Sequence, residues 1–490
     1  MRKKNAETQA TTLTRRSVRD RGFRPAFGRV VFSITRVEIL LFLSLWFVYG
    51  AAINSDNLLQ FNLQQIGVEA IVERGHFYLE GSTSAHLQPL GDVFLHDGHK
   101  YAAKQPGQFM AGAVIYGVLR AVGLSYTNNY LLVSALVTFF TTSLALAASN
   151  IAVFRISRGL VKDGRALFWP LAATLAYALA TTAFAYSGIA HHDALADAFL
   201  VLAFYLIFRL SRRRSAGGRG EPFSSACAGL LLGLTLTTSM LPFFMVLVCG
   251  LYFLSLRRWN LIPLFLCGAF AGLLPLFIYD AMSFGNPLLL ANVAGAGMFA
   301  DTFFYLDPKN FGDKIAFYAG SLVVYAPVFV LGLFGLTYYP RALKREPVFL
   351  ATVALPIVLA AYVFNIATTG DCQFGPRYLL PAMPFACLGL AGYSHLSKLS
   401  ERRFAGIVVI AVGLVSFVVN LVGAVRGAMC CPDGRGALRD QLAALTRGEP
   451  HSYPLARLLL IPLVISLLIL VLTFAARRVA DDSALKSEGA

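Results

Sequence analysis

Long apolar segments, separated by polar or basic stretches, run through almost the whole chain. A transmembrane helix needs about 20 apolar residues to cross a hydrocarbon core roughly 30 Å thick. Inside that core every backbone polar group needs an internal partner, so only helices and closed barrels cross it. The sequence therefore predicts an all-α polytopic transmembrane protein of about 12 helices, with a range of about 11–13. The predicted spans lie near 37–53, 129–154, 167–187, 193–209, 224–239, 242–256, 261–280, 315–338, 347–366, 378–396, 404–424 and 455–475. Pro242 leaves 224–256 open as one kinked helix or two short ones.

Composition supports this interpretation and excludes another. The chain is 57% hydrophobic and 14% charged, with a mean hydropathy of +0.63, whereas soluble proteins average about 25% charged residues. The net charge of +16 would suit a nucleic-acid-binding protein. However, the basic residues gather in 1–36 and beside the apolar segments, as expected for residues that set membrane orientation. We therefore expect no nucleic-acid partner.

The same charge pattern predicts a topology. The first apolar run is long and follows a basic stretch, so we expect a retained anchor rather than a cleaved signal peptide. Both termini are then cytoplasmic, and the loops 54–128, 281–314 and 425–454 are extracytoplasmic. We expect the plasma (inner) membrane of a bacterium. The predicted parts are a disordered tail at 1–36, a transmembrane domain at 37–400, C-terminal helices at 401–476 and a second tail at 477–490.

The first extracytoplasmic loop is predicted to be structured. Apolar residues recur at helical spacing from Asp56 to Arg74, which predicts an amphipathic helix able to lie on the membrane surface. Val93–Ala102 alternates around Asp97-Gly98, a pair that favours a tight hairpin turn. The apolar stretch Gln108–Gly123 predicts a helix that returns toward the bilayer.

Three acidic residues near the outer boundary are candidates for chemistry. Asp56 directly follows the first apolar span, where a carboxylate is either a helix terminator or a functional group. Asp193 and Asp197 are four residues apart and share one face of the fourth span. A charge at mid-bilayer costs roughly 2.5–3.5 kcal/mol, so this pair either faces a wet cavity or offsets the dipole at the helix N-terminus.

Two basic residues are candidates for binding a phosphate. Lys104 follows the hairpin and precedes Pro106-Gly107, which would hold its ammonium group in place. Arg377 opens the tenth span, where a guanidinium and free backbone N–H groups together suit an anion. The alternatives are a solvated lysine and an arginine that reaches for the membrane interface.

Taken together, these residues resemble the integral-membrane GT-C glycosyltransferases. The resemblance lies in Asp56, the run Asp97-Gly98…Tyr101…Lys104-x-Pro106-Gly107 and the acidic start of the fourth span. It is nearest to the family 39 group, which includes protein O-mannosyltransferases and the aminoarabinose transferase of lipid A. Phe374–Pro381 resembles a run in bacterial relatives of that group, and the resemblance covers roughly 37–400.

The resemblance implies a specific activity. A hexosyl or pentosyl group would move from a polyprenyl-phosphate donor to a hydroxyl of a lipid, glycan or protein acceptor, with inversion, on the extracytoplasmic face. Asp56 would be the base, Lys104 and Arg377 would bind the donor phosphate, and Asp193 would orient the acceptor or help hold a metal. The remaining residues expected to contact substrate are Tyr101, His192, Asp197, Asp371 and Tyr378.

Two departures from the family pattern bear on this interpretation. The family loop is typically Lys-Pro-Pro, whereas this chain has Lys104-Gln105-Pro106. The family often has a second acidic residue beside the first-loop Asp, whereas the neighbours here are Ser55 and Asn57. The second departure weakens metal binding by this loop, so the sequence allows a divalent cation but requires none.

Histidines and cysteines leave further alternatives open. His96 and His99 flank Asp97 in the hairpin as turn residues or as zinc ligands, although zinc usually takes three or four protein ligands. Four of the seven cysteines lie in apolar spans and three lie in outer segments, where disulfides form. The outer cysteines predict a bridge from Cys372 to Cys430 or Cys431.

Other classes of membrane protein remain alternatives to an enzyme. A transporter or a flippase for lipid-linked sugar would place ionisable residues near the bilayer midplane and often has two similar halves. A polysaccharide ligase or polymerase and a non-catalytic scaffold are further possibilities. The chain shows no internal repeat and its candidate residues gather at the outer boundary, so we favour the transferase.

Overall fold

The computed structural model describes most of the chain outside its N-terminal tail. The tail expected at 1–36 lies almost wholly outside the described residues, as do Asp371 and the cysteines of the expected bridge, Cys372, Cys430 and Cys431. The described ranges are 35–88, 91–163, 167–212, 220–295, 310–366, 368–369, 373–428, 437–448 and 451–488.

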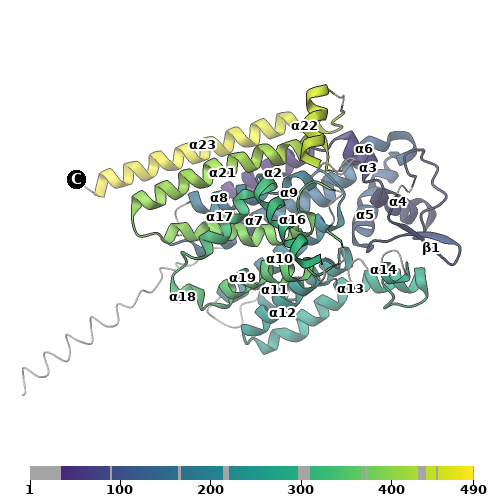
Figure 1. The fold of residues 1–490 in the computed structure, drawn as a ribbon, viewed down its shortest axis with the longest axis horizontal. Coiled ribbons are helices and arrows are strands. Elements are labelled where there is room, and N and C mark those ends of the chain that lie inside the picture. The colour runs from purple at the N-terminus through teal and green to yellow at the C-terminus, as the bar shows by residue number, and fades with distance from the viewer. Residues whose placement is uncertain are drawn as a thin grey trace, which may run out of the picture.

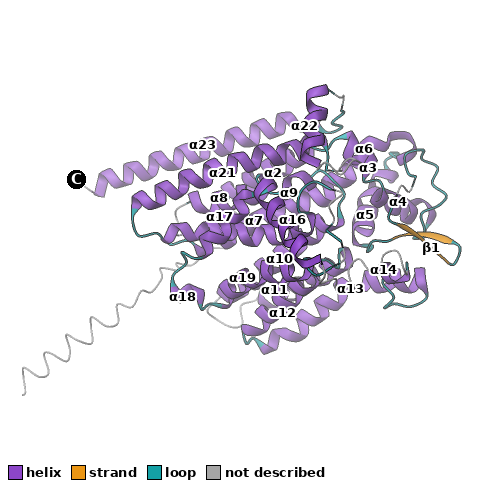
Figure 2. Ribbon diagram, viewed as in Figure 1, coloured by secondary structure: helices purple, strands orange, loops and turns teal. Residues whose placement is uncertain are grey.

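The regular secondary structure of the described chain is helical apart from one short hairpin, and loops connect these elements (Figures 1 and 2). The first third contains α2 (Arg36–Ala51), α3 (Ser55–Gln60), α4 (Leu63–Glu69), the π-helix η1 (Ala70–Arg74), β1 (Val93–His96), β2 (His99–Ala102), α5 (Gly107–Ala121), α6 (Tyr126–Thr138), the π-helix η2 (Phe139–Ser143) and α7 (Leu144–Leu160). The middle contains α8 (Phe168–Leu179), α9 (Thr182–Tyr186), α10 (His192–Arg212), α11 (Glu221–Thr238), α12 (Phe243–Ser255), the 3-10 helix η3 (Trp259–Leu261), α13 (Ile262–Phe284) and α14 (Ala291–Ala294). The last third contains α16 (Phe311–Tyr325), α17 (Pro327–Leu336), α18 (Arg341–Lys344), α19 (Pro347–Val363), the 3-10 helix η5 (Arg377–Ala382), α20 (Met383–Leu388), the 3-10 helix η6 (Gly389–His395), α21 (Leu399–Arg426), α22 (Ala437–Arg447) and α23 (Ala456–Glu488).

Several helices have the length and apolar character of membrane spans. Within the described residues, five qualify alone, at Tyr126–Leu160, His192–Arg212, Trp259–Phe284, Leu399–Arg426 and Ala456–Thr473. A sixth is gained if α16 and α17, which meet at 101°, form one broken span, and α8, α12 and α19 are shorter apolar helices. The chain is thus an integral membrane protein, while the expected count of twelve spans stays a prediction.

Proline explains two differences between the predicted spans and the observed helices. The stretch 224–256 is two helices, because α11 ends at Thr238 and Pro242 caps the start of α12. The span expected over 378–396 is not one regular helix but η5, α20 and η6. Pro381 lies inside η5, where its ring and missing N–H prevent a continuous α-helix.

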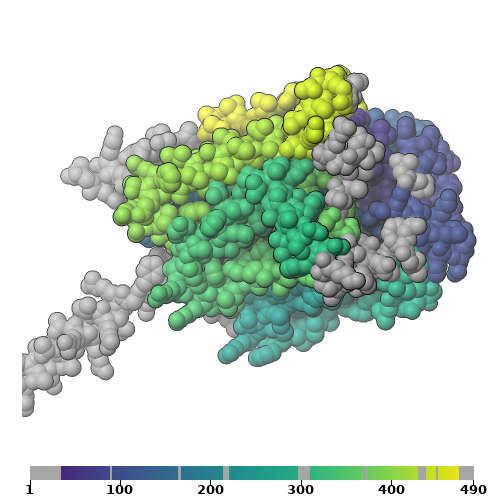
Figure 3. Space-filling model, in the orientation of Figure 1, coloured from purple at the N-terminus to yellow at the C-terminus, as the bar shows by residue number. Residues whose placement is uncertain are grey.

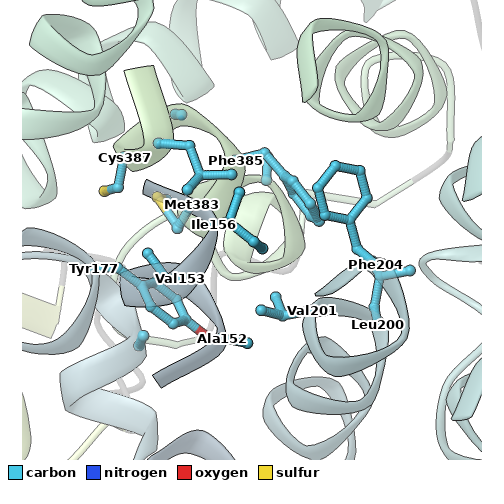
Figure 4. Close-up of a cluster of buried hydrophobic side chains, with 14 of the residues drawn as sticks. Ala152, Val153, Ile156, Tyr177, Leu200, Val201, Phe204, Met383, Phe385 and Cys387 are labelled. Carbon is cyan, nitrogen blue, oxygen red and sulfur yellow. The ribbon is translucent and has the colours of Figure 1, made fainter. Parts of the chain in front are cut away.

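The core of the bundle lies between α7, α8, α10 and α20. Figure 4 shows Ile156, Tyr177, Val201 and Phe385 converging there from these four helices, and all are buried. Elsewhere α11 and α13 pack so closely that glycine is required. A Cβ on Gly233 would lie 2.8 Å from the Cα of Gly272, so a larger residue would push these helices apart.

The segments expected to be extracytoplasmic gather at one end of the bundle. Figure 1 places α3, α4, α5, β1, α14 and α22 at the right-hand end, opposite the C-terminus. In Figure 3 the yellow surface of α22 lies at the same end as the purple surface of the first loop region. This arrangement brings the beginning and the last third of the chain together around the candidate site.

The first loop differs from the single amphipathic helix expected over Asp56–Arg74. That expectation is wrong in continuity, because Phe61 has a non-helical backbone between α3 and α4. It is also wrong in orientation, because Gln64 and Gln65 are 5% and 1% exposed. Gln65 accepts a 2.6 Å hydrogen bond from the Tyr126 hydroxyl, so the polar face turns into the protein.

Candidate active site

Asp56 lies in the first turn of a helix whose start is fixed by hydrogen bonds. Asn54 caps α3, and its side-chain oxygen accepts from the Asn57 backbone N–H at 2.9 Å. The Asp56 side chain is 33% exposed, and its Oδ1 lies 2.9 Å from Nδ1 of His451, whose side chain is 6% exposed. The carboxylate is therefore accessible and faces a buried histidine ring.

A second group forms at the N-terminal end of α10. The His191 and His192 rings stack with centroids 4.6 Å apart. His192 Nε2 lies 3.5 Å from Oδ1 of Asp193, which accepts a 2.7 Å hydrogen bond from the Ser239 hydroxyl. Asp193 is 2% exposed. It is thus a buried carboxylate held by one hydroxyl and surrounded by imidazoles.

The hairpin brings Lys104 into this region. β1 and β2 pair antiparallel with Val93 opposite Ala102, and Asp97 and Gly98 form the turn with positive φ angles of 46° and 83°. Lys104 Nζ then lies 2.9 Å from Asp92 Oδ2. This ion pair fixes the lysine immediately after the hairpin.

A close backbone approach sets the loop that carries Lys104. A Cβ on Gly107 would lie 2.7 Å from the Thr238 Cα and 2.9 Å from the Thr237 carbonyl oxygen. Only glycine therefore allows the loop to pack on the end of α11. Ser239, which binds Asp193, is the next residue of that chain, so the lysine loop is built onto the wall of the Asp193 group.

Arg377 completes the group from the other side. Its side chain is 10% exposed and its Nε lies 4.0 Å from Asp193 Oδ2. Nη2 donates a 3.0 Å hydrogen bond to the Tyr378 hydroxyl, and the guanidinium lies 4.7 Å from the centre of the Tyr378 ring. Within the described residues Nε has no hydrogen-bond partner. A buried donor without a partner marks this arginine as a place for an anion.

Charge and burial act together on the outer residues of this group. Burial lowers the pKa of His191 far below its usual range, and His192, Arg377 and Lys104 add to this effect, while Asp193 opposes it. Burial is the largest influence on Asp92 and raises its pKa, but the charge and hydrogen bond of Lys104, together with the charges of Arg377 and His192, lower the pKa overall. His191 is thus neutral near pH 7, and Asp92 is ionised.

Two sets of contacts link Asp56 to the Asp193 group. Along the first loop, the Phe61 ring packs 5.8 Å from His191, and Gln64 Nε2 lies 3.3 Å from His192 Nδ1. The other set passes through Ala428. Its N–H donates to Asn57 Oδ1 at 3.0 Å, and its carbonyl accepts from the Phe374 N–H at 2.8 Å. The two halves therefore form one contiguous region, although no direct contact joins their carboxylates in the described residues.

Other sequence candidates lie apart from this region. Asp197 accepts a 2.7 Å hydrogen bond from Tyr177 in the bundle core, whereas Asp193 faces Ser239. Tyr101 is 6% exposed and packs 5.3 Å from the Phe284 ring beneath the hairpin. Asp371 and the expected disulfide lie outside the described residues.

The zinc alternative has no ligand cluster in the described part of the chain. No group of three or more His, Cys, Asp or Glu side chains that could hold a metal occurs there. His99 Nδ1 lies 2.7 Å from Glu80 Oε1. His96 instead packs edge-on to the Phe284 ring. The two hairpin histidines thus have separate partners.

Sequence reasoning did not single out His451, Ser239 or Asp92. Ser239 lies at the break between α11 and α12, and the Pro242 signal could have drawn attention to it as a polar residue beside a helix end. Asp92 could have been noticed as a carboxylate before the hairpin. His451 carried no usable signal, because only the folded chain brings it to Asp56.

Comparison with solved structures gives distant likenesses. No protein-family model matches the chain, and no curated protein matches it. ArnT from Cupriavidus metallidurans bound to undecaprenyl phosphate is 15% identical with a TM-score of 0.49, over 88% of this chain and 71% of that one. The apo oligosaccharyltransferase of Archaeoglobus fulgidus is 11% identical with a TM-score of 0.48, over 83% and 57%. Archaeal AglB from Archaeoglobus fulgidus, in complex with an inhibitory peptide and a dolichol-phosphate, is 12% identical with a TM-score of 0.47, over 84% and 58%.

These neighbours are GT-C glycosyltransferases, the class that the sequence resembles. Every TM-score is below 0.5. The proposals that follow therefore rest on the residues and geometry of this chain.

Proposed function

We propose that this protein is a membrane glycosyltransferase that moves a sugar from a polyprenyl-phosphate donor to an acceptor hydroxyl. The observation that carries the proposal is the buried guanidinium of Arg377, whose Nε lacks a hydrogen-bond partner among the described residues. Its Nε lies 4.0 Å from Asp193, and the pKa of His191 is lowered by both Arg377 and Lys104. The side chains of Lys104 and Arg377, which come from distant segments, thus both place a positive charge near His191.

The two cations suit a departing phosphate. Bond cleavage at the anomeric carbon leaves charge on the lipid phosphate, and preorganised donors stabilise such charge best in a site that excludes water. Arg377 offers a fork of N–H groups from its buried position, and Lys104 offers a point charge. Asp92 is about half exposed, so an incoming phosphate can replace its carboxylate at the lysine.

The acidic residues suit the acceptor side of the reaction. The acceptor hydroxyl must lose its proton as it attacks the anomeric carbon, and a positioned base typically contributes 10²–10⁴-fold. The Asp56 half of the site supplies that base, because its carboxylate is accessible beside a buried imidazole. Asp193 and His192 would orient the acceptor. Attack opposite the departing phosphate inverts the anomeric centre.

Each predicted part of the chain has a role in the proposed reaction. The catalytic domain is 37–400, the helices at 401–476 close the site from the other side, and the reaction takes place on the extracytoplasmic face of a bacterial inner membrane. The gathering of the expected outer loops at one end of the bundle supports this sidedness (Figure 1). The sugar is a hexose or pentose, and the acceptor is a lipid, glycan or protein.

Sugar transfer in membrane vesicles tests the proposal. A panel of polyprenyl-phosphate sugars would be offered to wild type, to Asp56→Asn and to the control Asp97→Asn, whose side chain is 91% exposed at the hairpin tip. We expect wild type and the control to consume one donor and Asp56→Asn to lose about 10²-fold or more. If wild type consumes no donor while lipid-linked sugar crosses the membrane in its presence, the protein is a flippase.

A further inference from the structure

His451 presents a buried ring nitrogen to the accessible carboxylate of the first loop. Its side chain is 6% exposed, and Nδ1 lies 2.9 Å from Asp56 Oδ1 in an electrostatic contact rather than an aligned hydrogen bond. Within the described residues Nε2 has no hydrogen-bond partner and is shielded from solvent. A buried polar atom left unpaired is destabilising, so Nε2 is suited to accept a hydrogen bond from a substrate hydroxyl.

The position of this ring is fixed by main-chain contacts with the segment that carries Asp56. The Ser55 N–H donates to the Ser452 carbonyl at 2.9 Å, and the Ser452 N–H donates to the Ser55 hydroxyl at 3.2 Å. The Tyr453 hydroxyl donates to the Val425 carbonyl at 3.0 Å and ties the same segment to α21. The two residues that follow His451 thus hold it against Asp56.

We propose that His451 and Asp56 act as a pair in which Nε2 of His451 takes the proton of the acceptor hydroxyl. The Asp56 carboxylate holds the Nδ1 side of the ring and stabilises the imidazolium that forms. The proposal deepens the proposed glycosyl transfer and rests on it. It also assigns the catalytic proton transfer to a residue 395 positions after Asp56 in the sequence.

The reaction balances with these groups alone. The acceptor oxygen forms a bond to the anomeric carbon while the bond from that carbon to the phosphate oxygen breaks. The electron pair of the broken bond leaves with the polyprenyl phosphate, which Lys104 and Arg377 receive. The acceptor proton moves to Nε2 of His451 and is later released to water, which restores the neutral ring.

The charges around the ring agree with this role. Asp56 lies on α3 and contacts Nδ1. Burial raises the pKa of Tyr453, two residues beyond His451; the charge of Arg426 at the end of α21 opposes this and that of Asp56 adds to it. Among the described residues, Asp56 is the charged group that contacts the ring.

Substitutions at His451 separate catalysis from structure. His451→Asn keeps an amide near the position of Nδ1 and removes Nε2, and His451→Gln places an amide near Nε2 without a basic nitrogen. We expect both to lower kcat for transfer by about 10²-fold or more, with the KM for the polyprenyl-phosphate sugar within about threefold of wild type. Ser452→Ala is the matched control, because Ser452 contacts Ser55 through backbone atoms only, and it should keep wild-type kcat.

Chemical rescue and a double variant complete the test. Added imidazole should restore part of the kcat of His451→Ala, because it can occupy the space of the missing ring. The losses in Asp56→Asn and His451→Asn should not add in the double variant, because the two residues act as a unit. Full kcat in folded His451→Gln, with Asp56→Asn inactive, would overturn the pair and make Asp56 the direct base, leaving the transferase intact. A wild type that transfers sugar from no donor would instead overturn the proposed function itself, and the pair with it.

Discussion

Replacing Arg377 by Gln tests the phosphate half of the site. A hydrogen bond to a charged group contributes about 1.5–3 kcal/mol, and each 1.36 kcal/mol is a factor of about ten in rate. If one guanidinium N–H meets the departing phosphate, Arg377→Gln should lower kcat/KM for the donor roughly 10- to 150-fold. Arg377→Lys should lose less, because it keeps the charge and loses the planar fork that also reaches Tyr378.

The assay compares transfer with lipid binding. Initial rates at subsaturating polyprenyl-phosphate sugar give kcat/KM, and titration with free polyprenyl phosphate gives the affinity for the leaving group. We expect both to fall in Arg377→Gln and only partly in Arg377→Lys. The reasoning would be refuted by a folded Arg377→Gln protein whose kcat/KM and polyprenyl-phosphate affinity stay within about threefold of wild type.

A stability control is needed because Arg377 is buried beside Asp193. Removing one partner of a buried ion pair can cost about 3–5 kcal/mol, since the other charge is left uncompensated. Their separation of 4.0 Å is long for a direct pair, so the cost here should be smaller. Thermal unfolding of Arg377→Gln and of Arg377→Gln/Asp193→Asn would separate the two effects, because the double variant removes both charges and should recover stability without recovering phosphate binding.

Three further changes follow from contacts in and near the site. Gly107→Ala should lower transfer and cost about 1–3 kcal/mol of stability, because its Cβ would meet the Thr238 backbone; thermal unfolding and donor KM would show whether the chain accommodates it. Tyr177→Phe should cost about 1–3 kcal/mol in an unfolding assay, because it removes the hydroxyl that donates to Asp197 in the core. It should leave kcat within about twofold, and a large loss of kcat would place Asp197 in the site. The pKa of Asp92 is lowered on folding, so its ion pair stabilises the protein above the unfolded pKa of about 3.9 and the stabilisation is lost as pH falls through the lower folded pKa. The stability advantage of wild type over Asp92→Asn should thus be under about 1 kcal/mol at pH 7 and disappear in acid, and an advantage that grows as pH falls would reverse this sign.

Much of the fold is predictable because the bilayer restricts what an apolar chain can do. The apolar runs locate most helices of the bundle, and Pro242 marks the break between α11 and α12. The lengths of the individual helices are less predictable. The stretch that begins at Arg377 looks like a span by hydropathy but contains Pro381 and folds into short helical turns. Hydropathy reports burial in a lipid or protein interior and does not report the backbone conformation.

The candidate site is predictable only where a charge stands out against an apolar background. Lys104, Asp193 and Arg377 do so, and the fold brings them to one region. Helical spacing also paired Asp197 with Asp193, but four residues along the helix separate the Asp193 side chain, which faces Ser239, from Asp197, which lies in the core beside Tyr177. His451 does not stand out in this way, because it follows a polar loop. Its contact with Asp56 joins residues far apart in the sequence and exists only in the folded chain.

The first loop shows why amphipathic patterns need a different interpretation in this protein. Beside a membrane, a helix can expose its apolar face to lipid and turn its polar face into the protein, where each polar atom then needs a partner. Leu59 is 38% exposed while Ile66 is fully buried, and Gln64 and Gln65 are also nearly fully buried, against His192 and Tyr126. Gln64, which would mark a water-facing side in a soluble protein, here contacts His192 on the route from Asp56 to the Asp193 group. Polarity in the loops of such a chain therefore indicates the site as well as the solvent.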